Sequence, residues 1–264
     1  MSDIPAIPSS QFDAVLFDLD GVLTDTASLH ARAWKTMFDE FLRRYSAVHD
    51  LPFDPFEIGT DYRTYVDGKP RYEGVSAFLE SRRIVLPEGS IDDSPEADTT
   101  FGLGNRKNEM VQRFIADGVE PYATSVRVVQ LLREAGVRTA VVSSSRNAQP
   151  VLDAAGIAGL FEDVVDGIVA AEQDIPGKPE PDTFLAAAER LGVVPARTVV
   201  IEDAIAGVEA GRGGDFGLVI GVNRETQDGG ANARALQAHG ADIVVDDLGE
   251  LLSDDVAGAD DAPA

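Results

Sequence analysis

Residues 14–26 read AVLFDLDGVLTDT, and this stretch decides the fold. Its first four residues are apolar without the polar alternation of a half-exposed strand, which predicts a strand covered on both faces, as in a parallel sheet. Asp18 and Asp20 follow at once, and Gly21 allows the chain to turn sharply. In open α/β sheets, ligands bind where strands end, so this pair predicts a functional site. Taken alone, it is as readily explained as an ordinary turn.

Similar apolar runs recur along the chain at residues 139–142, 198–201 and 218–220, with 242–245 as a possible last strand. The segments 125–135 and 181–191 have apolar residues at helical spacing, and a glycine follows each. Strands that alternate with helices in this way predict an α/β fold. We expect a doubly wound, Rossmann-like parallel sheet with right-handed crossovers.

One stretch, residues 28–117, breaks this alternation. It contains three predicted helices, around 34–45, 75–81 and 107–115, and an intervening loop marked by Pro87, Gly89, Pro95 and Gly102. The connection is far longer than the usual few residues between a strand and the next element. We therefore expect an inserted helical cap at 28–117, on a core formed by 11–27 and 118–252. The polar segments 1–10 and 253–264 are expected to be flexible termini.

Three further polar clusters carry candidate chemistry. Residues 143–147, SSSRN, offer hydroxyls and a guanidinium for an anion, although a serine-rich helix cap is the common alternative. Lys178 stands between a glycine and a proline, which suits a fixed charge on a phosphate; the alternative is a solvated surface lysine. Glu202 and Asp203 follow a buried strand, where adjacent acids are costly without a cation. Their hard oxygen atoms suit Mg²⁺.

In this order, the four motifs resemble the haloacid dehalogenase (HAD) superfamily of aspartate-nucleophile phosphotransferases, over residues 12–251. A closer resemblance is to the β-phosphoglucomutase family, carried by FDLDGVLTDTASLHARAW, VVSSSRNAQPVLDAAGI, GKPEPDTFLAAAERLGV and IEDAIAGVEA. That family interconverts β-D-glucose 1-phosphate and glucose 6-phosphate through β-glucose 1,6-bisphosphate. The resemblance therefore implies a Mg²⁺-dependent enzyme that acts on a hexose phosphate through an aspartyl phosphate.

The resemblance also implies roles for core residues. Asp18 would be the nucleophile and a metal ligand, and Asp20 would be the general acid and base while its backbone carbonyl holds the metal. Asp203 would be a further metal ligand, with Glu202 nearby or acting through water. Ser143 and Lys178 would complete the cage around the transferring group. Because the chain has no cysteine and three histidines, a carboxylate is the natural proton carrier.

Other residues would bind the sugar phosphate or close the lid. Arg71, after Gly68, would grip the phosphate that is not transferring, and the core residues that would join it are Ser145, Arg146 and Asn147. His30 and Lys107 would link lid closure to catalysis; the alternatives are a loop cap for His30 and a solvated helix face for Lys107. The remaining candidate for substrate binding is Thr26. Residues 62–100 are longer than in compact members of the family and rich in Pro, Gly and acid, and substrate choice in this class lies largely in the lid.

Composition limits the partners. The formal net charge is −24 and the pI is about 4.3, so nucleic acid and anionic membranes are poor partners. The first ten residues do not resemble a signal peptide, and we expect a cytoplasmic monomer. A sugar-phosphate phosphatase of the same superfamily is the main rival function. A catalytically silent regulatory or binding protein is a remote alternative, and a dehalogenase is weaker still because the acids imply a metal.

Overall fold

A six-stranded parallel sheet forms the centre of the computed structural model, which describes residues 4, 6–224 and 229–252. The strand order is β3-β2-β1-β4-β5-β6, so that the first strand lies in the middle. The strands are β1 (Ala14–Phe17), β2 (Arg138–Val142), β3 (Asp163–Val165), β4 (Thr198–Glu202), β5 (Leu218–Val222) and β6 (Ile243–Val245). The predicted doubly wound α/β fold is confirmed, although β3 was not predicted.

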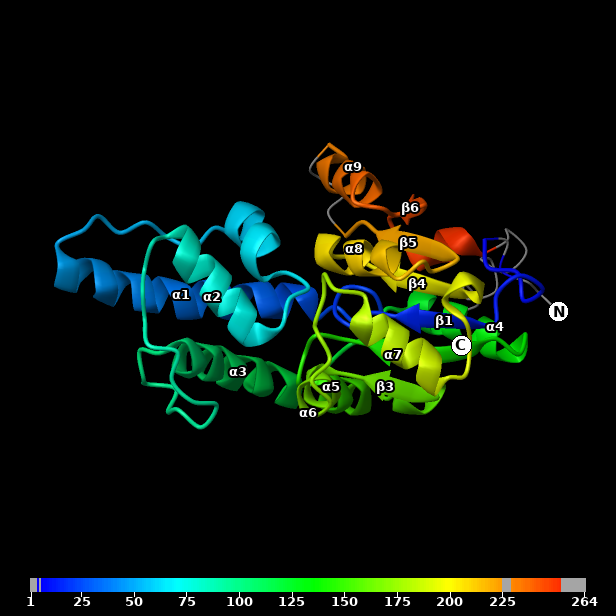
Figure 1. Cartoon of the computed structure of the whole chain (residues 1–264), viewed down its shortest axis with the longest axis horizontal. Coiled ribbons are helices and arrows are strands. Elements are labelled where there is room, and N and C mark those ends of the chain that lie inside the picture. Colours follow the sequence, from blue (N-terminus) through cyan, green and yellow to red (C-terminus); the bar gives the residue numbers. More distant parts are fainter. Residues whose placement is uncertain (1–3, 5, 225–228, 253–264) are drawn as a thin grey trace, which may run out of the picture.

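Helices cover both faces of this sheet (Figure 1). They are α4 (Ala123–Glu134), α5 (Ala148–Ala154), α6 (Gly167–Glu172), α7 (Asp182–Arg190), α8 (Ile205–Gly213) and α9 (Ala231–Ala238), with the short turns η2 (Ala158–Leu160), η3 (Pro195–Arg197) and η4 (Leu248–Leu251). Val15 and Phe17 of β1 pack into one apolar cluster with α4 and α5. Ala14 and Leu16 pack into another with α7. This two-sided burial explains why β1 is apolar throughout.

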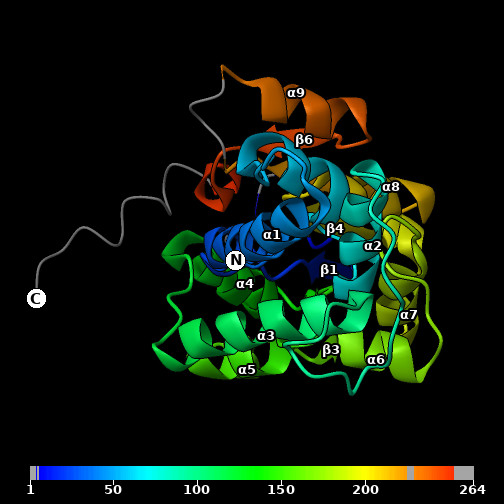
Figure 2. The same cartoon turned by 90° about the vertical axis from the view of Figure 1, so that its left-hand side faces the viewer.

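A second, helical unit follows β1, and we call it the cap. It consists of α1 (Ala27–His49), the π-helical segment η1 (Ile58–Val66), α2 (Arg71–Ser81) and α3 (Thr100–Ala116). Its own apolar cluster is rich in aromatic rings; Phe38 and Phe78, for example, have centroids 4.2 Å apart. Figure 2, viewed from the cap side, shows α1 in front of the sheet. The cap therefore has a separate core and lies at the end of the sheet where the site residues emerge.

Two local expectations differ from the structure. The sequence predicts a loop at Gly102, but this residue lies inside α3, which begins at Thr100. A Cβ at Gly102 would lie 2.3 Å from the Ala97 carbonyl oxygen, so the glycine permits close packing and does not break the helix. The N-terminal segment was expected to be flexible, yet Ile4 and Ile7 are buried in the core of the sheet domain. The predicted flexible segment 253–264 lies outside the described residues.

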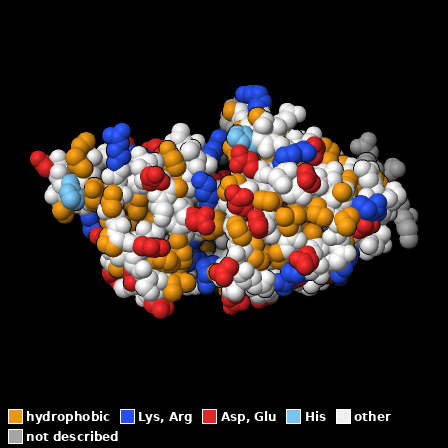
Figure 3. Space-filling model, viewed as in Figure 1, with side chains coloured by type: hydrophobic (Ala, Val, Ile, Leu, Met, Phe, Trp, Pro, Cys, Tyr) orange, Lys and Arg blue, Asp and Glu red, His pale blue; other side chains and the backbone are white. Residues whose placement is uncertain are grey.

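The last two features of the fold are the distribution of acidic side chains and the character of the helices. Acidic side chains are scattered over both lobes of the face shown in Figure 3, in keeping with the negative net charge. Within the described residues, no helix is both long enough and apolar enough to cross a membrane.

Candidate active site

A glycine shapes the loop that carries Asp18. The Asp18 backbone N–H donates to the Ile201 carbonyl oxygen at 2.9 Å, which ties the end of β1 to β4. Gly21 has a φ of +89°, a conformation that is strained for residues with a side chain. A Cβ at Gly21 would lie 1.8 Å from Asp203 Oδ2. The glycine therefore lets the loop run directly against the acid that follows β4.

Lys178 joins the first and last motifs of the core. Its Nζ donates to Asp18 Oδ1 at 2.6 Å, to Glu202 Oε1 at 2.5 Å and to the Val142 carbonyl at 3.0 Å. Burial alone would lower the pKa of Lys178, but the two carboxylates raise it above its usual value. Burial raises the pKa of Asp18, and the charge of Lys178 offsets this only in part. Lys178 is therefore a buried cation held between two acids, and the surface-lysine alternative is wrong.

The acids at the strand ends form a candidate metal site. Asp18, Glu202 and Asp203 each offer a carboxylate oxygen, and these atoms lie within 4.8 Å of one another. Burial raises the pKa of Asp203 well above its usual range, and the charges of Asp67 and Glu202 raise it further. A divalent cation would relieve this crowding, and an all-oxygen donor set suits Mg²⁺. The residues present therefore fit the cation implied by the family resemblance.

Asp20 lies beside this cluster and is oriented by side chains of its own loop. Thr26 Oγ1 donates to Asp20 Oδ1, and Thr24 Oγ1 lies 2.8 Å from Thr26 Oγ1. His30 Nε2 approaches the same Asp20 oxygen at 3.7 Å. Thr26 thus positions Asp20, which faces the pocket between the core and the cap.

His30 and Lys107 form a buried pair between α1 and α3. His30 Nδ1 lies 3.0 Å from Lys107 Nζ, which also stands 4.9 Å from the centroid of the Trp34 ring. Burial lowers the pKa of His30 to about 4, and the charge of Lys107 adds to this shift. Burial also lowers the pKa of Lys107 to about 7, with a further contribution from Arg71. Lys107 is 4% exposed, so it is not the solvated lysine of the alternative interpretation.

The serines after β2 form a compact turn. Ser143 Oγ accepts from the Ser145 backbone N–H at 3.1 Å, and Ser145 Oγ accepts from the Asn147 N–H at the same distance. Ser144 points to the cap, where its Oγ donates to the Gly68 carbonyl at 2.7 Å. The turn therefore has capping bonds, as the alternative interpretation expected, but it also contacts the cap.

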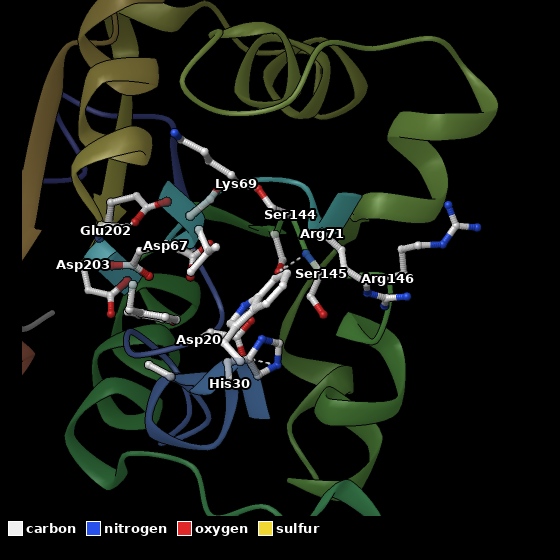
Figure 4. A pocket seen from close by; sticks show the side chains of 18 of the residues that line it. Asp20, His30, Asp67, Lys69, Arg71, Ser144, Ser145, Arg146, Glu202 and Asp203 are labelled. Carbon is white, nitrogen blue, oxygen red and sulfur yellow. Dashed lines mark hydrogen bonds and ion pairs between the residues drawn. The ribbon is translucent and has the colours of Figure 1, made fainter. Parts of the chain in front are cut away.

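Arginine and asparagine side chains connect the cap to this turn. Arg71 Nη2 and Asn147 Nδ2 both donate to Asn108 Oδ1, at 2.7 and 2.8 Å. Arg71 begins α2, and Asn108 comes from α3, next to Lys107. Figure 4 shows Arg71 and Arg146 together at the end of the pocket opposite Glu202 and Asp203. The pocket thus has an acidic end and a basic end.

Most of the predicted site residues line this one pocket, whose volume is about 60 Å³. They are Asp18, Asp20, His30, Gly68, Arg71, Lys107, Ser143, Ser145, Arg146, Glu202 and Asp203. The other three are each hydrogen-bonded to a neighbour: Thr26 to Asp20, Lys178 to Asp18, and Asn147 to Asn108. A water needs about 10–15 Å³ of such cavity volume, so the pocket has room for a few waters, less than a hexose phosphate needs. The cap must therefore move to admit such a substrate.

Asp67 and Tyr62 are pocket residues that the sequence reasoning missed. The Tyr62 hydroxyl forms a hydrogen bond with the Asp67 carboxylate. Burial raises the pKa of Asp67 to about 7, and the charge of Glu202 contributes. The one available signal was an acid directly before Gly68, inside a segment otherwise suited to bind phosphate. An acid brought against other acids is visible only once the cap and core are placed together.

The fold and site define a phosphotransferase of the haloacid dehalogenase type. Residues 12–215 match the model of the haloacid dehalogenase-like hydrolases, and the chain belongs to this family. It is therefore an enzyme of this phosphotransferase class.

Particular relatives narrow this class. The chain is 50% identical over 240 residues to a β-phosphoglucomutase of Mycobacterium tuberculosis, covering 90% of this chain and 91% of the relative. It is 30% identical over 202 residues to the fructose-1-phosphate phosphatase YqaB of Escherichia coli, covering 76% and 92%. A putative β-phosphoglucomutase structure from Thermotoga maritima is 26% identical with a TM-score of 0.60, covering 91% and 97%.

Proposed function

We propose that this chain is a β-phosphoglucomutase, which converts β-D-glucose 1-phosphate to glucose 6-phosphate through β-glucose 1,6-bisphosphate. The observation that carries the proposal is one pocket with two differently built ends. The acidic end suits phosphoryl transfer to and from Asp18. The basic end, at Arg71 and Arg146, suits a second phosphate group that a mutase must hold. The 50% identity to a mycobacterial β-phosphoglucomutase supports the same reaction.

Asp18 carries the phosphoryl group. In the phosphorylated enzyme, the 6-hydroxyl of β-glucose 1-phosphate attacks the phosphorus, an O–P bond forms, and the bond to the Asp18 carboxylate breaks. After the bisphosphate turns over, Asp18 attacks the other phosphorus, and the bond between that phosphorus and the C1 oxygen breaks. Glucose 6-phosphate leaves, and the phosphorylated enzyme is restored. Lys178 holds Asp18 Oδ1, which fixes the carboxylate for both steps.

Asp20 moves the proton in each step. It accepts the proton of the attacking hydroxyl in the first step and returns one to the leaving C1 oxygen in the second. Thr26 donates to Asp20 Oδ1, and His30 lies 3.7 Å from the same oxygen. Both contacts are made to Oδ1, so Asp20 Oδ2 would be the oxygen that exchanges the proton.

The basic end holds the phosphate that does not react. Arg71 offers the planar fork of donors that matches phosphate oxygens. Ser145, Arg146 and Asn147 provide further donors from the core side. Each of the two phosphate groups of the bisphosphate must bind in turn at the basic end of the pocket. The same donors therefore serve both half-reactions.

Mg²⁺ would be held by Asp18, Asp203 and the Asp20 backbone carbonyl, with Glu202 beside them. Bound there, it would offset the negative charge of the phosphate oxygens as they approach the Asp18 carboxylate. Ser143 lies on the pocket wall as a donor to the same oxygens.

The closed cap excludes water from the phosphorylated Asp18. The small pocket volume and the Ser144–Gly68 hydrogen bond show that cap and core are in contact. The buried His30–Lys107 pair would respond to an incoming phosphate. Burial lowers the pKa of Lys107, and a nearby negative charge would raise it again, so that Lys107 would bind a proton. Transfer to a sugar hydroxyl is then favoured over hydrolysis.

The proposal is tested by following two products together. The enzyme is given β-glucose 1-phosphate, MgCl₂ and a trace of the bisphosphate as primer. Glucose 6-phosphate is measured with a coupled dehydrogenase and inorganic phosphate with a colorimetric assay. We expect glucose 6-phosphate in large excess over inorganic phosphate. Equal amounts of the two would contradict the mutase.

A sugar-phosphate phosphatase is the second candidate. The 30% identity to a fructose-1-phosphate phosphatase favours it, because the nucleophile and metal residues serve hydrolysis equally well. Arg71 and the paired Lys107 argue for the mutase, since a phosphatase does not need a second phosphate site. A silent binding protein is disfavoured, because Asp18, Asp20 and Asp203 line one pocket and Lys178 is hydrogen-bonded to Asp18.

A further inference from the structure

The segment 67–70 of the cap packs against three loops of the core. Ser144 Oγ donates to the Gly68 carbonyl at 2.7 Å. A Cβ at Gly68 would lie 3.0 Å from the Ala204 Cβ, and a Cβ at Gly177 would lie 2.4 Å from Pro70 Cγ. Because the segment is in close contact with the core on both sides, it can adopt only one position when the cap is closed. The position of the neighbouring Asp67 is therefore set by cap closure.

Closure brings Asp67 to the candidate metal site. Figure 4 shows its side chain beside Glu202 and Asp203. Burial and then the charge of Asp67 raise the pKa of Asp203, and burial and then the charge of Glu202 raise the pKa of Asp67. Asp67 comes from the cap, whereas the other acids come from the core. The pocket therefore gains an additional carboxylate only in the closed arrangement.

The cations of the closed site do not balance these acids. Lys178 is already shared between Asp18 and Glu202. Arg63 of η1 lowers the pKa of Asp67, whereas burial and then the charges of Asp67 and Glu202 raise the pKa of Asp203. Like charges in a buried pocket repel strongly, because water screens them poorly. A divalent cation among Asp18, Glu202 and Asp203 would reverse this balance and attract Asp67.

We infer that Asp67 is a positioning residue that couples closure of the cap to magnesium binding in the core. Without the metal, the Asp67 carboxylate opposes closure; with the metal, it favours closure. By thermodynamic linkage, closure must then strengthen magnesium binding by the same factor. The inference rests on the proposed magnesium site but adds a role for a cap residue outside the phosphate-transfer machinery.

The test compares wild type with Asp67→Asn, which keeps the shape and removes the charge. Cap closure is measured as the radius of gyration by small-angle X-ray scattering, in EDTA and in saturating MgCl₂. A second readout is the fluorescence of Trp34, the single tryptophan of the chain, which lies in the cap and lines the pocket. Magnesium affinity is measured by titration calorimetry. KCl at matched ionic strength controls for screening.

We expect magnesium to compact the wild type and to shield Trp34 from acrylamide. Asp67→Asn should lose most of this response and bind magnesium more weakly, by about five- to a hundredfold. Asp67→Glu should retain the response because it keeps the charge. Glu80→Gln is the matched control, since Glu80 is an exposed acid on α2, and it should behave as wild type.

The outcomes separate the two proposals. If wild type binds magnesium but Asp67→Asn matches Glu80→Gln in all readouts, the coupling is wrong and the proposed function stands. If wild type binds no magnesium, both the coupling and the proposed metal site are wrong. If magnesium binds wild type without compacting it, the coupling is also wrong.

Discussion

The two ends of the pocket differ in how their charges are balanced before any substrate arrives. At the core end, Lys178 is hydrogen-bonded to Asp18, which follows β1, and to Glu202, the last residue of β4. At the cap end, Lys107 and Arg71 are buried with other basic groups, and burial lowers the pKa of both. The core end therefore holds more acids than Lys178 offsets and calls for a cation, whereas the cap end calls for an anion. This difference predicts that core substitutions remove the chemistry and cap substitutions change which phosphates are handled.

The largest expected effect is at Asp18. Asp18→Asn should lower turnover by at least about 10⁴-fold, because an amide is a poor nucleophile and the phosphorylated enzyme does not form. Turnover and the intact mass of the enzyme after reaction with the bisphosphate measure this. Asp25→Asn is the control, since Asp25 is an exposed acid in the same loop. Wild-type activity in Asp18→Asn would discard the mechanism.

Removal of Lys178 should destabilise the core end. Lys178→Met leaves Asp18 and Glu202 buried without their cation, so the free energy of unfolding should fall by about 3 kcal/mol. Urea unfolding in EDTA measures this loss. Arg190→Gln, which breaks an ion pair with Asp163 nearer the surface, should cost less than about 1 kcal/mol. Equal losses of unfolding free energy in the two variants would show that Lys178 does not stabilise Asp18 and Glu202 as its contacts indicate.

Arg71 tests the cap end selectively. Arg71→Ala should lower mutase kcat/KM by about 10²-fold, because a desolvated charge contact to phosphate is lost. Hydrolysis of a simple phosphate ester should change little, since that substrate has one phosphate. Arg113→Gln is the control, as Arg113 is an exposed cap arginine. A similar loss in both reactions would argue against a second phosphate site.

Lys107, at the cap end, should make the stability of the protein depend on pH. Because burial lowers its pKa to about 7, the unfolded chain holds more protons than the folded chain from about pH 7 up to the usual lysine pKa. Stability from this group should therefore rise with pH in that window. The free energy of unfolding of wild type, minus that of Lys107→Met, should increase between about pH 7 and pH 10. If this difference in unfolding free energy does not change with pH, the pKa of Lys107 is not lowered in the folded protein.

The smallest effect is expected at the contact between the two ends. Ser144→Ala removes the hydrogen bond to the Gly68 carbonyl, which is worth about 1 kcal/mol. Closure should become slightly less favourable, so KM should rise several-fold with little change in kcat. Steady-state kinetics measure this, with Ser76→Ala on the exposed face of α2 as the control. An unchanged KM would show that this bond does not contribute to closure.

Sequence predicted the core end better than the cap end, for physical reasons. Strands buried on both faces, such as Ala14–Phe17, have an unmistakable composition, and the acids that follow them meet because parallel strands end at one edge. β3 was missed because three residues carry too little pattern. Gly102 was misinterpreted because its role, close packing against Ala97, is tertiary. Asp67 was missed because its neighbours come from the core. The domain boundaries, the cytoplasmic location and the monomeric state stay predictions.

The most direct test of the central claim follows the phosphorus signals of substrate, bisphosphate and products during one reaction. Anomer-resolved ³¹P and ¹H NMR is recorded on β-glucose 1-phosphate with MgCl₂ and a trace of bisphosphate primer. The account predicts that the β-anomer signal decays into glucose 6-phosphate while the bisphosphate remains at trace level and inorganic phosphate hardly appears. Decay into free glucose and inorganic phosphate would contradict transfer between two ends of one substrate.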